Sequence, residues 1–115
     1  MFSQAELQNM LSAFTEKCKT LFGEKLLDVR LYGSYARGDQ EKYSDIDVMV
    51  LLDMDDSEAR KHLKNVCDIA SDVSLAHNGM NLSPFVGSKE HYDMLKNFPG
   101  FYNNVMMEGV STVVR

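Results

Sequence analysis

The chain has 115 residues, enough for one hydrophobic core, and we expect residues 1–115 to form a single domain. Hydrophobic residues make up 44% of the chain and charged residues 25%, which is typical of a soluble globular protein. The net charge of −5 argues against long DNA or RNA as a substrate, because proteins that grip the nucleic-acid backbone usually carry a basic excess.

The sequence contains no apolar stretch long enough to span a membrane, and its start lacks the pattern of a signal peptide. We therefore expect a cytoplasmic protein. Cys18 and Cys67 both fall on apolar stripes of predicted helices, so we expect buried, reduced thiols. The three histidines have no metal-ligand spacing.

The first predicted element is a helix that begins after Ser3. Ser3 and Glu6 form a capping box, apolar residues then recur at helical spacing, and Gly23 supplies a stop. A strand is predicted next at residues 26–32. Its alternation puts three apolar side chains on one face: Leu27, Val29 and Leu31.

Gly33-Ser34 interrupts this strand, and a short helix is predicted from Ser34 to about Arg37. Residues 46–52 are almost continuously apolar, which predicts a central strand that is buried on both faces. Helical spacing then predicts one helix over residues 58–77.

A third strand is predicted at residues 80–86. Pro84 cannot donate a hydrogen bond within a sheet, so this strand is expected to lie at an edge or to be irregular at that residue. Ser88 caps a further helix that runs to about residue 97, and a short helix at 101–108 and a strand at 110–114 complete the chain. The order of elements predicts an α/β (α+β) fold, with helices packed on a small mixed β-sheet.

The dipeptide Gly33-Ser34 has the chemistry of a phosphate site. A glycine after a strand lets backbone amides approach an anion closely, and a helix that begins at Ser34 points unpaired N–H groups at that anion. The Ser34 hydroxyl adds another donor. Taken alone, however, a strand followed by Gly-Ser is more often only a tight turn.

Asp45 and Asp47 are the second candidate feature. Residues two apart on a strand point to the same side, so their carboxylates converge. Magnesium relieves the resulting repulsion and can bridge to a triphosphate. For an isolated Asp-x-Asp, a solvated acidic strand start is the better interpretation.

The two features occur together on one strand–turn–helix–loop–strand frame. The matching residues are Gly33, Ser34, Gly38, Ser44, Asp45 and Asp47. This constellation resembles the polymerase β-like nucleotidyltransferase superfamily. In detail, residues 33–39 and 44–48 are similar to the minimal nucleotidyltransferases (MNT), many of which are antitoxins encoded beside helical HEPN ribonuclease toxins. Residues 82–90 and 103–110 also resemble one subgroup of this branch.

The resemblance implies the nucleotidyltransferase fold and magnesium-dependent transfer of a nucleotidyl group, AMP from ATP, to a hydroxyl of a partner protein. Gly33 and Ser34 would hold phosphate, while Asp45 and Asp47 would hold two magnesium ions, with Ser34 also part of the catalytic set. Arg37 would either reach a phosphate or pair with Asp39. The partner would be a HEPN-type toxin or a second copy of the chain.

The sequence departs from the superfamily in lacking a third carboxylate on the strand predicted at 80–86. Ser83 stands where that acid is expected, with Asn81 as the other polar candidate, and Asp28 or Asp53 remain as substitutes from elsewhere. The absence leaves the second magnesium ion in doubt. It also favours a tyrosine acceptor, since a phenol with an ordinary pKa of about 10 ionises more easily than an aliphatic hydroxyl.

Two alternatives stay open. The first alternative to an enzyme that acts on a partner protein is a degenerate module that binds NTP or toxin without turnover. The second, which is less favoured, is a modifier of small molecules, for which we see no acceptor-binding domain. Five aromatic residues can form a partner surface, although we expect most of them in the core. They are Tyr35, Phe85, Phe98, Phe101 and Tyr102.

Overall fold

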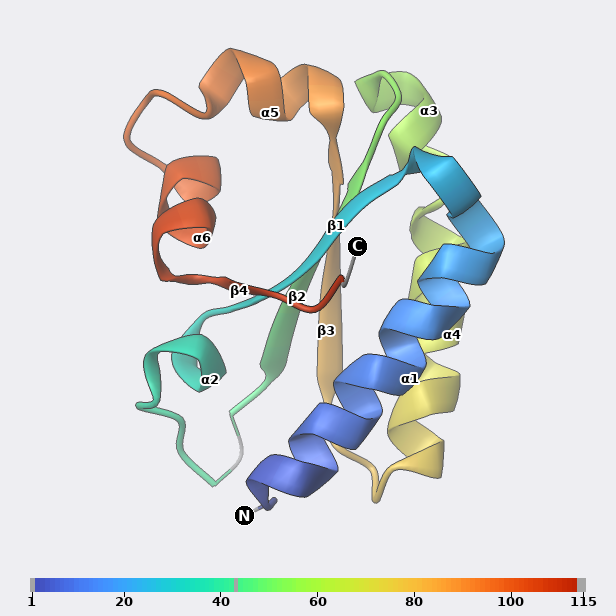
Figure 1. Cartoon of the computed structure of the whole chain (residues 1–115), viewed down its shortest axis with the longest axis vertical. Coiled ribbons are helices and arrows are strands. Elements are labelled where there is room, and N and C mark those ends of the chain that lie inside the picture. Colours follow the sequence, from blue (N-terminus) through green and yellow to red (C-terminus); the bar gives the residue numbers. More distant parts are fainter. Residues whose placement is uncertain (1, 43, 114–115) are drawn as a thin grey trace.

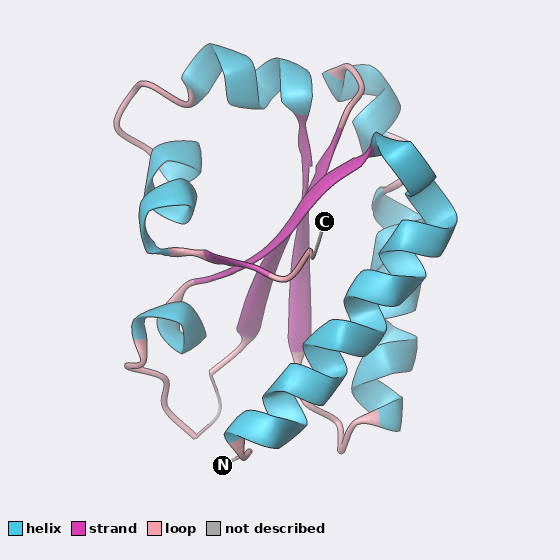
Figure 2. Ribbon diagram, in the orientation of Figure 1, coloured by secondary structure: helices cyan, strands magenta, loops and turns pink. Residues whose placement is uncertain are grey.

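The computed structural model describes residues 2–42 and 44–113. Within these ranges a mixed four-stranded sheet carries helices on both faces (Figures 1 and 2). The elements in chain order are α1 (Gln4–Phe22), the 3₁₀ helix η1 (Gly23–Lys25), β1 (Leu26–Tyr32), α2 (Ser34–Arg37), β2 (Ile46–Leu52), α3 (Asp56–Arg60), α4 (Leu63–Ala76), β3 (Leu82–Ser88), α5 (Lys89–Leu95), α6 (Phe101–Glu108) and β4 (Val110–Ser111). The predicted α+β fold class is confirmed.

Helix α1 has the capping box that the sequence predicts. The Glu6 amide donates to the Ser3 hydroxyl at 3.1 Å, and the Ser3 amide donates to the Glu6 carboxylate at 3.1 Å. One stripe of the helix, from Leu7 to Phe22, is buried against the sheet and α4. Gly23 has a φ of 55° and ends the helix.

The strands lie in the order β3-β2-β1-β4. Strand β2 is central, antiparallel to β1 and parallel to β3, as its continuous apolar run predicts. Strand β3 is at an edge, which confirms the expectation from Pro84. It spans Leu82–Ser88, two residues later than predicted. Strand β4 pairs only with Arg30 and Leu31 of β1 and ends at Ser111. The predicted end at Val114 lies outside the described residues.

The alternation of β2 divides the molecule into two layers. Four of its side chains point into the main core, against α1 and α4: Ile46, Val48, Val50 and Leu52. Met49 and Leu51 point the other way and pack with Tyr102 and Val105 of α6. Figure 1 shows α1 and α4 on one side of the sheet and α5 and α6 on the other. Asp47 is two residues before Met49 and therefore shares its face of the sheet, so the Asp47 carboxylate faces the α6 side.

The single helix predicted over residues 58–77 is wrong in one respect, because the structure divides it into α3 and α4. The amides of Lys61 and His62 donate to carbonyls three residues earlier, at 3.2 and 3.1 Å, and this tighter winding breaks the α-helix. The break rotates the apolar stripe. Ala59 and Val66 are buried, whereas Leu63 is 48% exposed.

The sequence analysis predicted that Leu27 shares a face with Val29 and Leu31, and this prediction is wrong. The pairing of β1 with β2 shifts between Leu26 and Asp28, which leaves an extra residue in β1. Leu26, Val29 and Leu31 therefore line the main core, while Leu27 packs in the cluster under α6.

Other burial predictions hold only in part. Cys18 is fully buried, but Cys67 is exposed on α4. Of the five aromatic residues, Tyr102 is in the core and Tyr35 is half-buried against it. Phe85, Phe98 and Phe101 are 37%, 62% and 40% exposed, so they are surface residues. Among the described residues, no helix combines the length and apolar character needed to cross a membrane.

Candidate functional site

Three polar side chains lie in one row across the sheet. Asp47, the second residue of β2, is opposite Tyr32 at the end of β1 and opposite Ser83 near the start of β3. Paired positions share a face of the sheet, so all three belong to the α6 side. Burial and the charge of Asp47 raise the pKa of Tyr32 to about 12, as expected for a phenol beside this carboxylate.

Gly33 follows β1 directly and lies against Asp47. Its φ of 75° and ψ of −153° form a conformation that residues with a side chain rarely adopt. A β-carbon at this position would collide with the Asp47 carboxylate. The sequence predicts that a glycine here permits a close approach to the backbone, and in this structure the approaching group is Asp47.

Helix α2 is a single short turn that positions Ser34 and Arg37. The Gly33 carbonyl accepts hydrogen bonds from the amides of Ala36 and Arg37, both at 3.1 Å. Gly38, with a φ of 81°, ends the turn in the left-handed region. The turn places Ser34 and Arg37 on the walls of one cleft.

This cleft has a volume of about 400 Å³ and lies between the ends of β1 and β2, α2 and α6. It brings together four of the predicted site residues, Gly33, Ser34, Arg37 and Asp47. Asp45, just before β2, is exposed and is not among the lining residues. The remaining lining residues are Tyr32, Phe101, Asn104, Val105 and Glu108.

Hollows of about 440 and 560 Å³ also lie elsewhere on the protein. The larger is bordered by α1 and α4 residues such as Glu16 and Ile69, and the other by Asp28 and Arg30. Neither contains a residue of the Gly-Ser or Asp-x-Asp motif. Chemistry rather than size therefore selects the cleft at Asp47.

Asp45 and Asp47 act on each other electrostatically. Burial raises the pKa of Asp47, and the negative charge of Asp45 raises it further, while the positive charge of Arg37 lowers it. The Asn81 side-chain amide donates a hydrogen bond to the Asp45 carboxylate. A carboxylate that resists ionisation beside a second one is a place where a cation is stabilising.

The donor set fits magnesium bound together with phosphate. No group of three or more His, Cys, Asp or Glu side chains gathers around a metal position within residues 2–42 and 44–113. The protein thus offers two carboxylates, Asp45 and Asp47. Magnesium is commonly held by one or two carboxylates, with phosphate oxygens and waters completing its octahedron.

The candidates for a third acid lie as follows. Ser83 is directly beside Asp47, and Asn81 is bonded to Asp45. Asp28 is opposite Leu51, near the other end of the sheet, where it is bonded to Arg30 at 2.9 Å. The Asp53 amide bonds the carbonyl of Lys25, which immediately precedes β1, so Asp53 also lies at that distant end. Neither distant acid is placed to join the pair.

Glu108, the last residue of α6, is a site residue that the sequence reasoning missed. Its Oε1 accepts hydrogen bonds from the Gly33 amide at 3.2 Å and from Arg37 Nη1 at 3.2 Å. A carboxylate at the carboxyl end of a helix opposes the helix dipole, so it needs a cation nearby. That rule was the available signal, but it does not say which cation is used.

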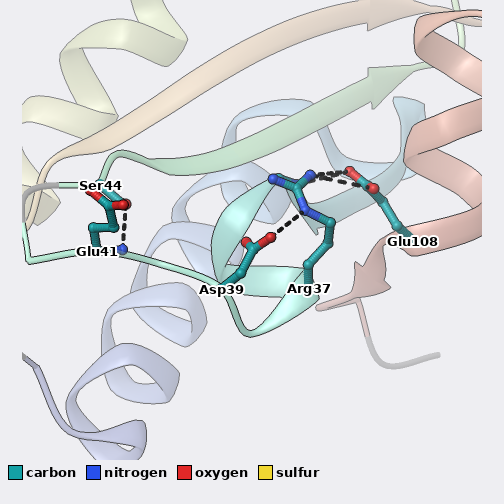
Figure 3. A network of polar contacts seen from close by, with 6 residues as sticks. Arg37, Asp39, Glu41, Ser44 and Glu108 are labelled. Atoms are coloured by element: carbon teal, nitrogen blue, oxygen red, sulfur yellow. Dashed lines mark hydrogen bonds and ion pairs between the residues drawn. The ribbon is translucent and has the colours of Figure 1, made fainter.

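Arg37 lies between two carboxylates, as Figure 3 shows. Its Nε donates to Asp39 at 3.2 Å, which confirms the predicted pair, and its Nη1 donates to Glu108. Both interactions raise the pKa of Arg37, with Asp39 the larger cause. In the same view the Glu41 amide donates to the Ser44 hydroxyl at 2.8 Å, which shapes the loop before Asp45.

Comparison with known proteins identifies the family of the chain. The family model of the nucleotidyltransferase domain matches residues 11–94, which include every motif residue. Three proteins of Methanocaldococcus jannaschii, all named as candidate protein adenylyltransferases, are similar to the chain. One is 36% identical over 70% of this chain, a second 33% identical over 73%, and a third 28% identical over 89%.

The matched segments cover 54%, 82% and 93% of these three relatives, so this chain spans about half the length of the first. A solved structure described as a toxin-antitoxin with AMP-PNP is also similar, with 19% identity and a TM-score of 0.47, over 87% of this chain and 70% of that one. The family match over residues 11–94 and the second relative, 33% identical over 73% of this chain, show that this chain belongs to the nucleotidyltransferase domain family.

Proposed function

We propose that this chain is a magnesium-dependent protein adenylyltransferase, which transfers AMP from ATP to a hydroxyl of a partner protein. The observation that carries the proposal is the meeting of Gly33, Ser34 and Asp47 in one cleft, with Arg37 on its wall. Anion donors and a metal-binding carboxylate are thereby adjacent, as a metal-bound triphosphate requires. The names of the three relatives support transfer of AMP to a protein.

The chain's own residues divide into two groups. Gly33 and Ser34 contribute N–H and hydroxyl donors to the phosphates, and Arg37 adds a positive charge beside them. Asp45 and Asp47 hold the cation, and the hydrogen bond from Asn81 keeps the Asp45 carboxylate in place. Magnesium, when bound, neutralises triphosphate charge and stabilises the leaving pyrophosphate.

The acceptor is a tyrosine of the partner protein. The position beside Asp47 is Ser83 and not an acid, so β3 adds no carboxylate to the Asp45–Asp47 pair to help deprotonate a hydroxyl. A phenol, with an ordinary pKa of about 10, requires less assistance than an aliphatic alcohol. The net charge of −5 agrees with a protein partner and a small metal-bound nucleotide in preference to a long nucleic acid.

The partner is a helical HEPN-type toxin, with this chain as its antitoxin in the cytoplasm, and a homodimer is the alternative assembly. This part of the proposal rests on the resemblance of residues 33–39 and 44–48 to minimal nucleotidyltransferases. If the toxin is the substrate, incubation with ATP and magnesium adds one AMP to a toxin tyrosine, which intact-mass and peptide mass spectrometry detect. An unmodified toxin under conditions in which a related enzyme works would contradict the proposal.

The second candidate function is a non-catalytic module that neutralises the toxin by contact. The serine beside Asp47 is the observation that favours it. The double variant Asp45→Asn/Asp47→Asn separates the two functions, because it removes the cation site and keeps the shape of the surface. Neutralisation that survives this change would indicate contact, whereas its loss together with AMP transfer would indicate chemistry.

A matched control is Asp68→Asn/Asp72→Asn. These two carboxylates lie on the exposed side of α4, far from the cleft, and their replacement removes the same amount of charge. The control should transfer AMP as the unmodified chain does. Calorimetry of ATP with magnesium on the three proteins is the preliminary measurement.

A further inference from the structure

We propose that Glu108 is a resident anion that occupies the phosphate donors of the cleft, so that a nucleotide binds only after displacing it. The inference rests on the proposed function, since it takes the Gly33 and Arg37 donors as part of the triphosphate site. It adds that α6 closes this site in the free protein.

The contacts of Glu108 are those that a phosphate would make. One carboxylate oxygen accepts from the Gly33 amide and from Arg37 Nη1, both at 3.2 Å, and the other oxygen accepts from the same Nη1 at 3.5 Å. Backbone amides and guanidinium groups are the usual donors to both carboxylates and phosphates. An incoming phosphate oxygen at Gly33 would therefore meet the Glu108 carboxylate.

The position of Glu108 in α6 does not by itself favour a carboxylate. Glu108 is the last residue of the helix, where the dipole disfavours negative charge. The hydrogen bonds to Gly33 and Arg37 offset this cost only while Glu108 stays in the cleft. The side chain is 29% exposed, so it has a route to solvent.

The chain after Glu108 is anchored, which restricts displacement to the side chain and the end of α6. Arg30 Nη1 donates to the Gly109 carbonyl at 3.1 Å, and a β-carbon on Gly109 would collide with the Arg30 side chain. Further on, the Thr112 amide donates to the Val29 carbonyl at 2.7 Å. These contacts hold residues 109–112 on β1, so a nucleotide need not unfold this segment to displace Glu108.

A role of Glu108 as the missing third metal ligand is less consistent with the geometry. Among the residues that the structure describes, Glu108 does not join Asp45 and Asp47 in a group that can hold a metal ion. Its oxygens instead face N–H donors. Donors of this kind bind anions, so the carboxylate competes with the phosphates and does not add to the acidic pair.

The test is calorimetric titration of magnesium–ATP, magnesium–tripolyphosphate and adenosine into the unmodified chain, Glu108→Gln and Glu108→Ala. The Gln variant keeps the size and removes the charge, whereas the Ala variant also removes the acceptor. Glu24→Gln is the matched control, because Glu24 precedes β1 at the end opposite Gly33. Circular dichroism verifies that each variant is folded.

We expect Glu108→Gln to bind ATP and tripolyphosphate about fivefold more tightly, because a neutral amide holds the donors less strongly than a carboxylate, and Glu108→Ala about tenfold, because alanine does not occupy them. Adenosine binding should change less than about twofold, as should all binding by Glu24→Gln. Unchanged or weaker phosphate binding by both Glu108 variants, with ATP still bound by the unmodified chain, would overturn the inference alone. Absence of ATP and tripolyphosphate binding in every protein would overturn the proposed function, and the inference with it.

Discussion

The Asp47 carboxylate occupies the space that a β-carbon on Gly33 would need. This contact joins the two halves of the motif, which are 14 residues apart in the chain, into one structural unit. The glycine whose amide donates to the Glu108 carboxylate is also the glycine that makes room for the Asp47 carboxylate. If the cleft holds a metal-bound triphosphate as proposed, a larger residue at position 33 would disturb both the phosphate side and the metal side.

Replacement of Gly33 by alanine should lower the free energy of unfolding by about 2–3 kcal/mol. Both the unusual backbone conformation and the collision with Asp47 contribute. Gly23→Ala separates these causes, since Gly23 has a similar backbone conformation, with φ 55° and ψ −129°, but no atom within 4 Å of its β-carbon position. That control should lose about 1–2 kcal/mol. Urea unfolding followed by circular dichroism measures both, and equal losses would argue against the collision.

Asp47→Asn should stabilise the free protein at neutral pH. The pKa of Asp47 is raised in the fold, first by burial and then by Asp45, so its ionised form is disfavoured there. Below the ordinary pKa of 3.8 the Asp47 carboxyl is protonated in both the folded and the unfolded chain. Its folded form therefore contributes most stability at low pH, and that contribution is lost as the pH rises through the raised pKa. At pH 7 the variant should gain a few tenths of a kcal/mol, because solvent screens part of the effect.

The measurement is urea unfolding in EDTA at pH 7 and at pH 3.5, with Asp72→Asn on the exposed side of α4 as the control for loss of a surface charge. The gain from Asp47→Asn should be smaller at pH 3.5. A gain of the same size at both pH values would mean that ionisation of Asp47 is not its cause. The same variant should bind magnesium–ATP more weakly than the unmodified chain, so function and stability oppose each other at this position.

The two cysteines should differ in reactivity. Burial raises the pKa of the Cys18 thiol to about 12, and its side chain is inaccessible, whereas Cys67 is exposed on α4. A thiol reagent at pH 8 should therefore modify one thiol in the folded protein and two in urea. Cys67→Ser should abolish the native reaction, and Cys18→Ser should leave it intact. Native labelling of Cys18 would contradict its burial.

The sequence was sufficient for the elements that local pattern specifies. The capping box at Ser3 and Glu6, the central position of β2 and the edge position that Pro84 imposes on β3 were all confirmed. The clustering of Gly33 and Asp47 also followed from the motif, because the strand and the tight turn determine both positions.

Other features depend on contacts that no local pattern encodes. The extra residue at Leu27 arises from the pairing of two strands, and the break between α3 and α4 comes from hydrogen bonds that shorten one turn. Glu108 lies 75 positions after Gly33, and only the packing of α6 on the sheet brings them together. Such long-range placement leaves little trace in one sequence.

Ser83→Asp should restore a third carboxylate, because position 83 is directly beside Asp47 on the neighbouring strand. Like charges opposite one another destabilise a sheet, so in EDTA the variant should unfold at a temperature about 2–6 °C lower. Magnesium should reverse this loss, because a cation held by three carboxylates binds more tightly, and so stabilises the fold more, than a cation held by two. Scanning calorimetry with and without magnesium measures the difference.

Ser83→Asn is the control of equal size without charge, and magnesium should stabilise it no more than it stabilises the unmodified chain. An equal magnesium effect in Ser83→Asp and Ser83→Asn would mean that position 83 does not face the metal. If Ser83→Asp does respond, its transfer of AMP to serine or threonine peptides should rise relative to transfer to tyrosine. The residue beside Asp47 would then determine which hydroxyl this site can activate, because an added base helps most where the acceptor is hardest to ionise.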